Sequence, residues 1–376
     1  MSSSMAPLPQ IYGIYALETI AVNNVTTDNP SWLHRDPSNG ALYCLNEGLS
    51  VSNGSISSFK IGGDGSLSLL GNVPTINGPV SSVLFNRGKT LAAAHYGGSG
   101  ITTHSVQADG TLKTPPNTNL QHDGPWPGFP TDKTSPTPTK PSLTQPSNSS
   151  WFPISAPISC ASFPFDPKTA LLTQQTPYKA PAASGPRHGV FHQTESGDTY
   201  YYLVSELGNK ISSFESRIYG NQTTPAGAAA AVCLLTPDGR PHPPPARVTP
   251  QSFLPPQPPA HPQNKNFPSP PTQSKPGAFN SKLSYKDTPA GSLSFAQEFP
   301  SGGVYPRQMS LNKDGTLVAI ALQQSARVVI VERDPESGLF GKFVADVQIG
   351  EFSTAASLNG QITSVIWDEE LQIQGK

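Results

Sequence analysis

The feature of this sequence that most constrains its fold is a repeated unit. Each unit has a short apolar run, a turn, a second apolar run, and then one or two alternating runs joined by Asp-Gly or Ser-Gly. The unit is clear in SSVLFNRGKTLAAAHYGGSG with ITTHSVQADGTLKT, and again in RQMSLNKDGTLVAIALQQSA with RVVIVERDPESGLFGKFVADV. Short runs linked by tight turns predict four antiparallel strands, and a sheet that recurs every ~40–50 residues is typical of a propeller blade.

The runs within one unit differ in their apolar pattern. Residues 91–94 and 316–322 are nearly continuously apolar, which predicts inner strands buried between neighbouring sheets, whereas residues 56–61 alternate as an outer strand does. The 3.6-residue period that helical repeats require is absent. We therefore predict an all-β protein, a β-propeller of four-stranded antiparallel blades, with residues 1–376 forming a single domain.

Two stretches rich in proline, residues 125–157 and 241–280, interrupt the repeat. Because proline cannot donate to a strand ladder, we predict that both stretches are irregular and that two blades are disrupted. AAAAVCLLTPDGR, before the second stretch, is interpreted as an inner strand with its turn. SCASFPFDPKTALLTQQTPYKAP and LSYKDTPAGSLSFAQEF are interpreted as outer pairs of strands. A gene-model fault, such as a retained intron or a shifted frame, and a genuine insertion would both produce this pattern.

Charge and hydropathy exclude several classes of function. The chain has 24 basic and 25 acidic residues, a formal net charge of −1, and no basic run, so we predict no nucleic-acid partner. No apolar stretch approaches the length of a membrane span, which predicts no membrane partner. The N-terminal residues lack the pattern of a signal peptide, so a cytoplasmic location is expected. Nothing in the sequence predicts the oligomeric state.

The sequence predicts neither a metal site nor an organic cofactor. Its cysteines and several histidines are widely separated and lack the close pairs that metal sites use. We expect the cysteines to be buried free thiols, and the histidines to be packing or surface residues. These residues are Cys44, Cys160, Cys233, His34, His95, His104 and His192.

Several motifs of the chain resemble those of one protein family. They are NPSWLHRDPSNGALYCLNE (29–47), GPRHGVFH (185–192), LVSELGNKISSFE (203–215), YPRQMSLNKDGTLVAIALQ (305–323) and VIWDE (365–369). In this combination and order, they resemble the lactonase family of seven-bladed β-propellers, which includes fungal carboxy-cis,cis-muconate cyclases and bacterial 6-phosphogluconolactonases. The resemblance implies seven blades around a central channel, with the active site on one face of the propeller.

The same resemblance implies particular site residues. The cyclases of the family use two arginines, a glutamate and a histidine. By position in the motifs, the arginines would be Arg187 and Arg307, and the glutamate would be Glu206. The family histidine belongs to a His-Pro-His-Gln strand after a Gly-Pro pair, but here Trp126-Pro127 follows that pair, so the histidine has no counterpart.

These residue types fit the chemistry of lactones that carry an anionic group. A guanidinium stays charged and binds a carboxylate or phosphate bidentately, so Arg187 and Arg307 are predicted to bind substrate. Glu206 is the candidate for proton transfer, which both lactone formation and lactone hydrolysis require. His188 is a further candidate for substrate binding, although strand alternation predicts that it faces away from its neighbour Arg187.

The sequence therefore predicts an enzyme of the lactonase family that acts on a small lactone bearing a carboxylate or phosphate. Two reactions remain open: cyclisation of 3-carboxy-cis,cis-muconate, as an isomerase, and ring-opening of 6-phosphogluconolactone, as a hydrolase. Loss of the family histidine would impair either reaction. A non-catalytic β-propeller that serves as a binding scaffold is the alternative. A third alternative is an unstable chain, because two damaged blades would leave open sheet edges.

Overall fold

The computed structural model of the chain describes its strands and many of the turns between them. All regular secondary structure among the described residues is β-strand. Within that part of the chain, no helix is long and apolar enough to cross a membrane. The described residues are 16–98, 100–121, 142–143, 151–156, 159–166, 168–173, 178–179, 186–193, 199–205, 210–218, 232–233, 281–287, 293–352 and 361–369.

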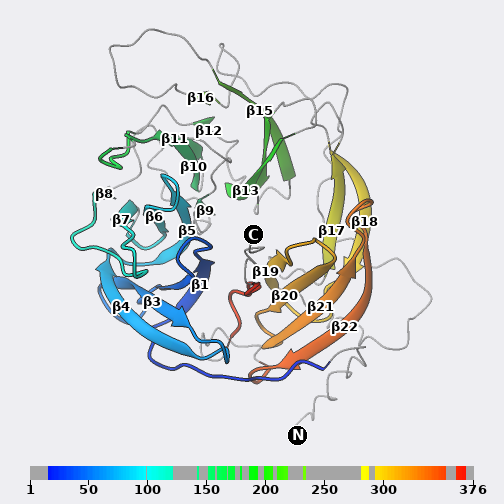
Figure 1. Ribbon diagram of the computed structural model, residues 1–376. Coiled ribbons are helices and arrows are strands. Elements are labelled where there is room, and N and C mark those ends of the chain that lie inside the picture. The colour runs from blue at the N-terminus through cyan, green and yellow to red at the C-terminus, as the bar shows by residue number, and fades with distance from the viewer. Residues whose placement is uncertain are drawn as a thin grey trace, which may run out of the picture. The chain divides into compact units, whose positions relative to one another are not determined.

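The described strands form five four-stranded sheets and one two-stranded sheet (Figure 1). In each four-stranded sheet, here called a blade, consecutive strands pair antiparallel, which confirms the predicted blade architecture. The blades are β1 (Pro30–Arg35), β2 (Ala41–Asn46), β3 (Gly54–Ile61) and β4 (Leu67–Thr75); β5 (Pro79–Phe85), β6 (Thr90–His95), β7 (Gly100–Ser105) and β8 (Thr118–Gln121); β9 (Ser142–Leu143), β10 (Trp151–Ala156), β11 (Ser159–Pro164) and β12 (Tyr178–Lys179); β13 (Pro186–Gln193), β14 (Thr199–Ser205), β15 (Lys210–Ile218) and β16 (Val232–Cys233); and β19 (Pro306–Leu311), β20 (Leu317–Leu322), β21 (Arg327–Arg333) and β22 (Phe340–Gln348). The two-stranded sheet is β17 (Ser281–Asp287) and β18 (Leu293–Pro300).

The strands belong to two compact units. The larger unit, mainly residues 20–252, contains β1 to β16. The smaller unit, mainly residues 253–286 and 295–369, contains β19 to β22 and most of β17 and β18. Each unit has its own apolar core, described separately below.

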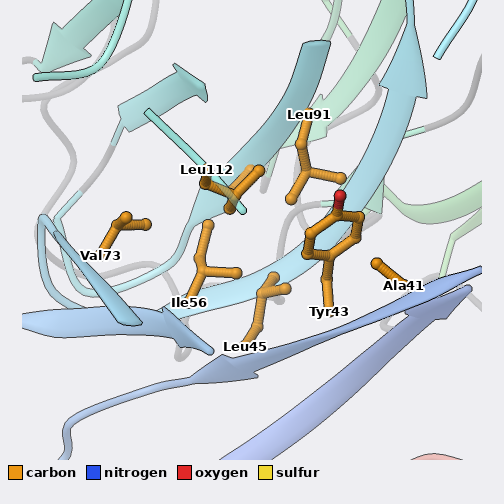
Figure 2. Close-up of a cluster of buried hydrophobic side chains, with 8 residues drawn as sticks. Ala41, Tyr43, Leu45, Ile56, Val73, Leu91 and Leu112 are labelled. Carbon is orange, nitrogen blue, oxygen red and sulfur yellow. The ribbon is translucent and has the colours of Figure 1, made fainter. Parts of the chain in front are cut away.

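In the larger unit, the core lies between successive blades. Tyr43, Leu45 and Ile56 of blade β1–β4 pack against Leu91 and Ala93 of blade β5–β8, and all five are fully buried (Figure 2). This face-to-face contact explains why β2 and β6 are apolar at successive positions: one face of each strand lies in this interface, and every residue of both strands is buried. The prediction of continuously apolar inner strands is therefore confirmed.

The opposite face of blade β5–β8 forms a second interface in the same unit. Phe85 and Ile101 of that blade pack with Phe165, which follows β11. The rings of Phe85 and Phe165 meet edge to face, with centroids 4.7 Å apart, a favoured geometry for aromatic pairs. Three blades of the larger unit are thus joined in chain order by apolar contacts, as in a propeller.

In the smaller unit, both faces of β20 are buried. Val318 and Ile320 pack on one face with Val329 of β21, and Ala319 packs on the other face, in a cluster that includes Trp367. The indole Nε1 of Trp367 donates a hydrogen bond to the carbonyl of Ser310 in β19 at 3.0 Å. The closing VIWDE motif therefore runs beside the first strand of this blade.

The first proline-rich stretch is not wholly irregular, which corrects the prediction for residues 125–157. β9 and β10 lie inside this stretch and supply the two strands that precede β11 and β12, the predicted outer pair. Pro153 lies in β10 opposite Ser162 of β11, and the described pairing of β10 with β9 covers Ile154 and Ser155. Residues 241–280 lie outside the described residues.

The interpretation of AAAAVCLLTPDGR as an inner strand was wrong. Val232 and Cys233 form β16, the last strand of its blade, and pair with Ile218 and Arg217 of β15. An apolar run fits an inner strand, but a short run carries no information about which neighbour it pairs with. Blade β13–β16 is therefore complete without any strand from residues 241–280.

Candidate active site

A β-bulge follows a proline in the first strand of four blades. In β1, β5 and β19 one residue after the proline is skipped in the pairing, and in β13 two residues lie opposite one. A bulge removes a residue from the ladder and redirects its side chain, and bulges are frequent beside active sites. The four prolines are Pro30, Pro79, Pro186 and Pro306.

Arg307 is the skipped residue in β19. Its Nη1 donates a hydrogen bond to Oε1 of Gln323 at 2.9 Å, and that glutamine is only 7% exposed. The backbone N–H of Gln323 donates to the carbonyl of Tyr305 at 2.9 Å, and its side-chain amide donates to Oε1 of Gln361. Tyr305 has a φ of 63°, a conformation uncommon for a bulky residue. Arg307 is thus held, half-buried, by a network on both sides of the bulge.

His188 lies in the bulge of β13 and contacts an aromatic residue of another blade. Its ring stacks on Trp32 of β1, with centroids 6.3 Å apart and planes inclined by 15°. His188 and Arg187 lie together opposite Val204, because Pro186 pairs with Ser205 and the next pair is formed by Gly189. The expectation that they face opposite sides assumed regular alternation, and the bulge removes that premise.

The remaining predicted site residues are described only in part. Arg187 belongs to the backbone of β13, in the larger unit, whereas Arg307 belongs to the smaller unit. Glu206 directly follows β14 in the sequence and lies outside the described residues, as does the Gly124-Pro125 pair that marks the expected place of the family histidine. The joint action of the two arginines with Glu206 remains a prediction.

Sequence reasoning missed two residues that contact the predicted site: Gln323 and Trp32. Aligning the repeats would have identified the first. Gln323 follows the strand that pairs with the Pro-Arg motif of β19, and Glu206 follows the strand that pairs with the Pro-Arg motif of β13. Trp32 had no comparable signal, because its contact with His188 joins strands far apart in the chain.

Two titratable side chains of the larger unit, His95 and Cys44, are deeply buried. Among the described residues, no group of three or more His, Cys, Asp and Glu side chains could hold a metal ion. Burial lowers the pKa of His95 to about 3, so this imidazole is neutral near neutral pH. Burial raises the pKa of the Cys44 thiol to about 12. Cys44 is a buried free thiol, as predicted; the side chains of the other two cysteines lie outside the described structure.

A known family matches most of the chain. The family described as lactonase, 7-bladed beta-propeller, matches residues 14–229 and 280–356. The interruption at 230–279 coincides closely with the second proline-rich stretch, whereas the first stretch lies within the matched region. The motifs that contain Arg187, Glu206 and Arg307 all fall inside the match.

Individual proteins show the same likeness at low identity. The chain is 23% identical over 336 residues to a protein of Arthroderma benhamiae described as "Probable 6-phosphogluconolactonase", covering 84% of this chain and 76% of that relative. The structure of a periplasmic gluconolactonase from Pseudomonas aeruginosa aligns with a TM-score of 0.60 at 20% identity, covering 88% of each chain. A protein of Lactobacillus plantarum aligns with a TM-score of 0.58 at 17% identity, covering 86% of this chain and 88% of that one. Together with the family match, these likenesses confirm the predicted propeller fold.

Proposed function

Because this chain belongs to the lactonase family of seven-bladed β-propellers, we propose that it opens the ring of a sugar-acid lactone that carries an anionic group, with 6-phosphogluconolactone as the candidate substrate. The observation that carries the proposal is the placement of Arg307. The family motif puts this arginine at a β-bulge, and Gln323 holds its guanidinium at 2.9 Å. The description of the Arthroderma relative supports the same substrate.

The proposed reaction adds water to the lactone carbonyl. The water oxygen forms a bond to the carbonyl carbon, the bond from that carbon to the ring oxygen breaks, and the ring oxygen leaves as an alkoxide that takes a proton. The products are one carboxylic acid, which ionises in neutral water, and one hydroxyl group. No oxidant or reductant is consumed.

Each predicted residue has a distinct part in this proposal. Arg307 and Arg187 bind the phosphate and so fix the position of the ring, because guanidinium groups bind phosphate through paired, charge-assisted hydrogen bonds. Glu206 receives the proton of the attacking water and returns a proton to the leaving alkoxide. His188, stacked on Trp32, offers an aromatic surface to the sugar ring.

The test is ring-opening of 6-phosphogluconolactone by the purified protein and its Arg307→Ala variant, with spontaneous hydrolysis subtracted. Loss of a charge-assisted hydrogen bond worth roughly 2 kcal/mol lowers kcat/KM by about 30-fold. Ser31→Ala is the matched control, because Ser31 is the skipped residue of the equivalent bulge in β1. This control should keep its full activity.

Cyclisation of 3-carboxymuconate is measured alongside, because it is the other reaction of the family. Turnover of this compound alone would replace the hydrolase proposal with the cyclase reaction. A cooperatively folded protein that turns over neither compound would favour a binding scaffold instead. Equal activity of the wild type and Arg307→Ala would remove Arg307 from the proposed site.

A further inference from the structure

The hydrogen bond between Arg307 and Gln323 is the most completely defined polar contact of the predicted site. Gln323 is 7% exposed, so its side chain is fixed by its surroundings. Its Oε1 accepts from Arg307, its Nε2 donates to Gln361, and its backbone N–H donates to Tyr305. Each of these contacts lies within the smaller unit. Gln323 is therefore linked to this region in two ways. Its side chain binds the Arg307 guanidinium, and its backbone N–H binds the carbonyl of Tyr305, two residues before Arg307.

The charge of this partner matters as much as its position. A carboxylate at the same place would accept the same hydrogen bond but would add a negative charge beside the guanidinium, and that charge would repel an added anion. Gln323 supplies the acceptor without a negative charge. At the corresponding sequence position after β14 the residue is Glu206, so the residues at these two positions of the sequence differ in charge.

We propose that Gln323 is a positioning residue, which orients Arg307 toward the anionic group of the substrate and, by being neutral, adds no negative charge beside the guanidinium that binds this group. The inference rests on the proposed lactonase function. It assigns selectivity for an anionic lactone to the Arg307–Gln323 pair. A neutral lactone would gain nothing from the pair.

The decisive variant is Gln323→Glu, which keeps the acceptor and changes its charge. Gln361 can rotate its amide to donate to the new carboxylate, so the network can be preserved. We expect KM for 6-phosphogluconolactone to rise about 10-fold or more, and kcat to change less than about 3-fold, because the lost interaction binds a group remote from the reacting carbonyl. KM for glucono-1,5-lactone, which lacks the phosphate, should stay unchanged.

Gln308→Glu is the matched control for the added charge. Gln308 is the next residue along β19, and its Oε1 accepts a hydrogen bond from the backbone N–H of Val365 at 2.6 Å. A carboxylate can accept the same bond, so the change adds one negative charge near Arg307 without replacing its partner. KM for the phosphorylated lactone should rise less than about 3-fold. An equal rise in both variants would show a general field effect and overturn the role of Gln323.

A second variant separates orientation from charge. Gln323→Met has a similar length but cannot accept the bond from Arg307. We expect it to raise KM for the phosphorylated lactone by less than Gln323→Glu does, and to leave KM for the neutral lactone unchanged. A parallel loss of kcat with both lactones would indicate a structural role alone and overturn the proposal.

Calorimetric binding of 6-phosphogluconate provides a readout that does not need turnover. Weaker binding by Gln323→Glu than by Gln308→Glu would support the inference even if the wild type opened no lactone, in which case the proposed reaction alone would fail. Unchanged binding in Gln323→Glu would overturn the inference even if the wild type were active. Thermal unfolding of each variant identifies any that do not fold. If Gln323→Glu or Gln323→Met does not fold, the KM values of the other variant decide between a positioning role and a structural role.

Discussion

Blade β1–β4 and blade β19–β22 join their third and fourth strands through side chains of different charge. The register places Ser55 of β3 and Arg327 of β21 at corresponding positions, because each lies opposite the residue that pairs with the proline before the bulge. Asn72 of β4 and Asp346 of β22 also correspond. In one blade these strands are joined by neutral hydrogen bonds, and in the other by an ion pair.

The neutral version shares its hydrogen bonds among several groups. The amide of Asn72 donates to the hydroxyls of Ser55 and Ser57 at 3.1 and 2.9 Å. Asn46 donates to the same two hydroxyls at 3.1 Å each. Because the serines have two amide donors each, the loss of one donor leaves both hydroxyls with a partner.

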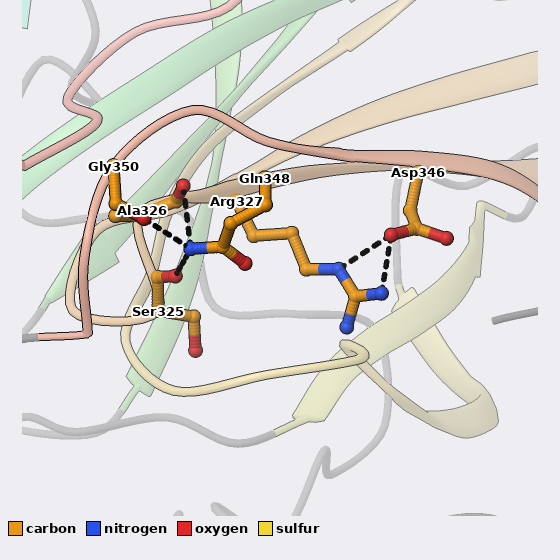
Figure 3. Close-up of polar contacts among 6 residues, drawn as sticks. All are labelled: Ser325, Ala326, Arg327, Asp346, Gln348 and Gly350. Carbon is orange, nitrogen blue, oxygen red and sulfur yellow. Dashed lines mark hydrogen bonds and ion pairs between the residues drawn. The ribbon is translucent and has the colours of Figure 1, made fainter. Parts of the chain in front are cut away.

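The charged version joins the strands through an ion pair. Nε of Arg327 donates to Oδ2 of Asp346 at 2.7 Å, and a second guanidinium nitrogen contacts the same oxygen (Figure 3). The side chains are only 7% and 15% exposed. Gln348 completes the region by donating to the carbonyls of Ser325 and Ala326 at 2.8 and 3.2 Å. The two blades therefore use polar groups of different charge at corresponding positions.

The largest expected effect is on the charged blade. Asp346→Ala should lower the free energy of unfolding by about 3–5 kcal/mol, because it removes the carboxylate from a buried guanidinium. Urea denaturation monitored by circular dichroism measures the loss. The double variant Arg327→Met with Asp346→Leu should recover most of it, since apolar side chains carry no desolvation cost. A loss below about 1 kcal/mol for Asp346→Ala would mean that the two blades do not differ as the structure indicates.

Blade β5–β8 has a buried histidine at a corresponding position, and the contribution of this histidine to stability depends on pH. His95 of β6 corresponds to Asn46, and its Nε2 lies 2.9 Å from the hydroxyl of Thr102. Burial lowers its pKa from 6.5 to about 3. Below pH 6.5 the unfolded imidazole takes up a proton that the folded one does not, so this contribution to stability is complete above pH 6.5 and is lost as the pH falls toward 3.

This shift predicts that wild-type stability falls by about 2 kcal/mol more between pH 7 and pH 5 than that of the His95→Asn variant, at about 1.4 kcal/mol per pH unit. Asparagine is the residue that blade β1–β4 uses at the same position, so the substitution makes the two blades alike. Urea midpoints at both pH values measure the difference. His104, also buried, is present in both proteins, and so cannot account for it. Parallel pH dependence would contradict the assignment.

The sequence predicted those parts of the fold that depend on local pattern. Continuous apolar runs identified β6 and β20 as buried strands, and the motifs identified Arg307 as a candidate site residue. These predictions succeed because the burial of a strand on both faces leaves a direct record in composition. The turn at residues 86–88, between two apolar runs of the repeat, also follows the local pattern, and its three residues have φ values of 52°, 57° and 76°.

The sequence could not predict the features that depend on register. A bulge shifts pairing by one residue without changing the apolar pattern, so the position of Arg307 outside the ladder and the joint position of Arg187 and His188 were not visible. The local sequence pattern also does not encode which segment a strand pairs with or contacts. This explains the error at Val232 and the unforeseen contact of Trp32 with His188. These are the features that define the candidate site.

The smallest expected effect is on the neutral blade, where Asn72→Ala should cost about 0.5–1 kcal/mol of unfolding free energy. Asn72 is itself exposed to solvent, and Asn46 continues to donate to both serine hydroxyls. Urea denaturation under the conditions used for Asp346→Ala measures it. Adding Asn46→Ala should then cost more than the sum of the two single losses, because only the double variant leaves buried hydroxyls without an amide donor. Strict additivity would show that the two amides do not share the serines, and would contradict this account of the neutral blade.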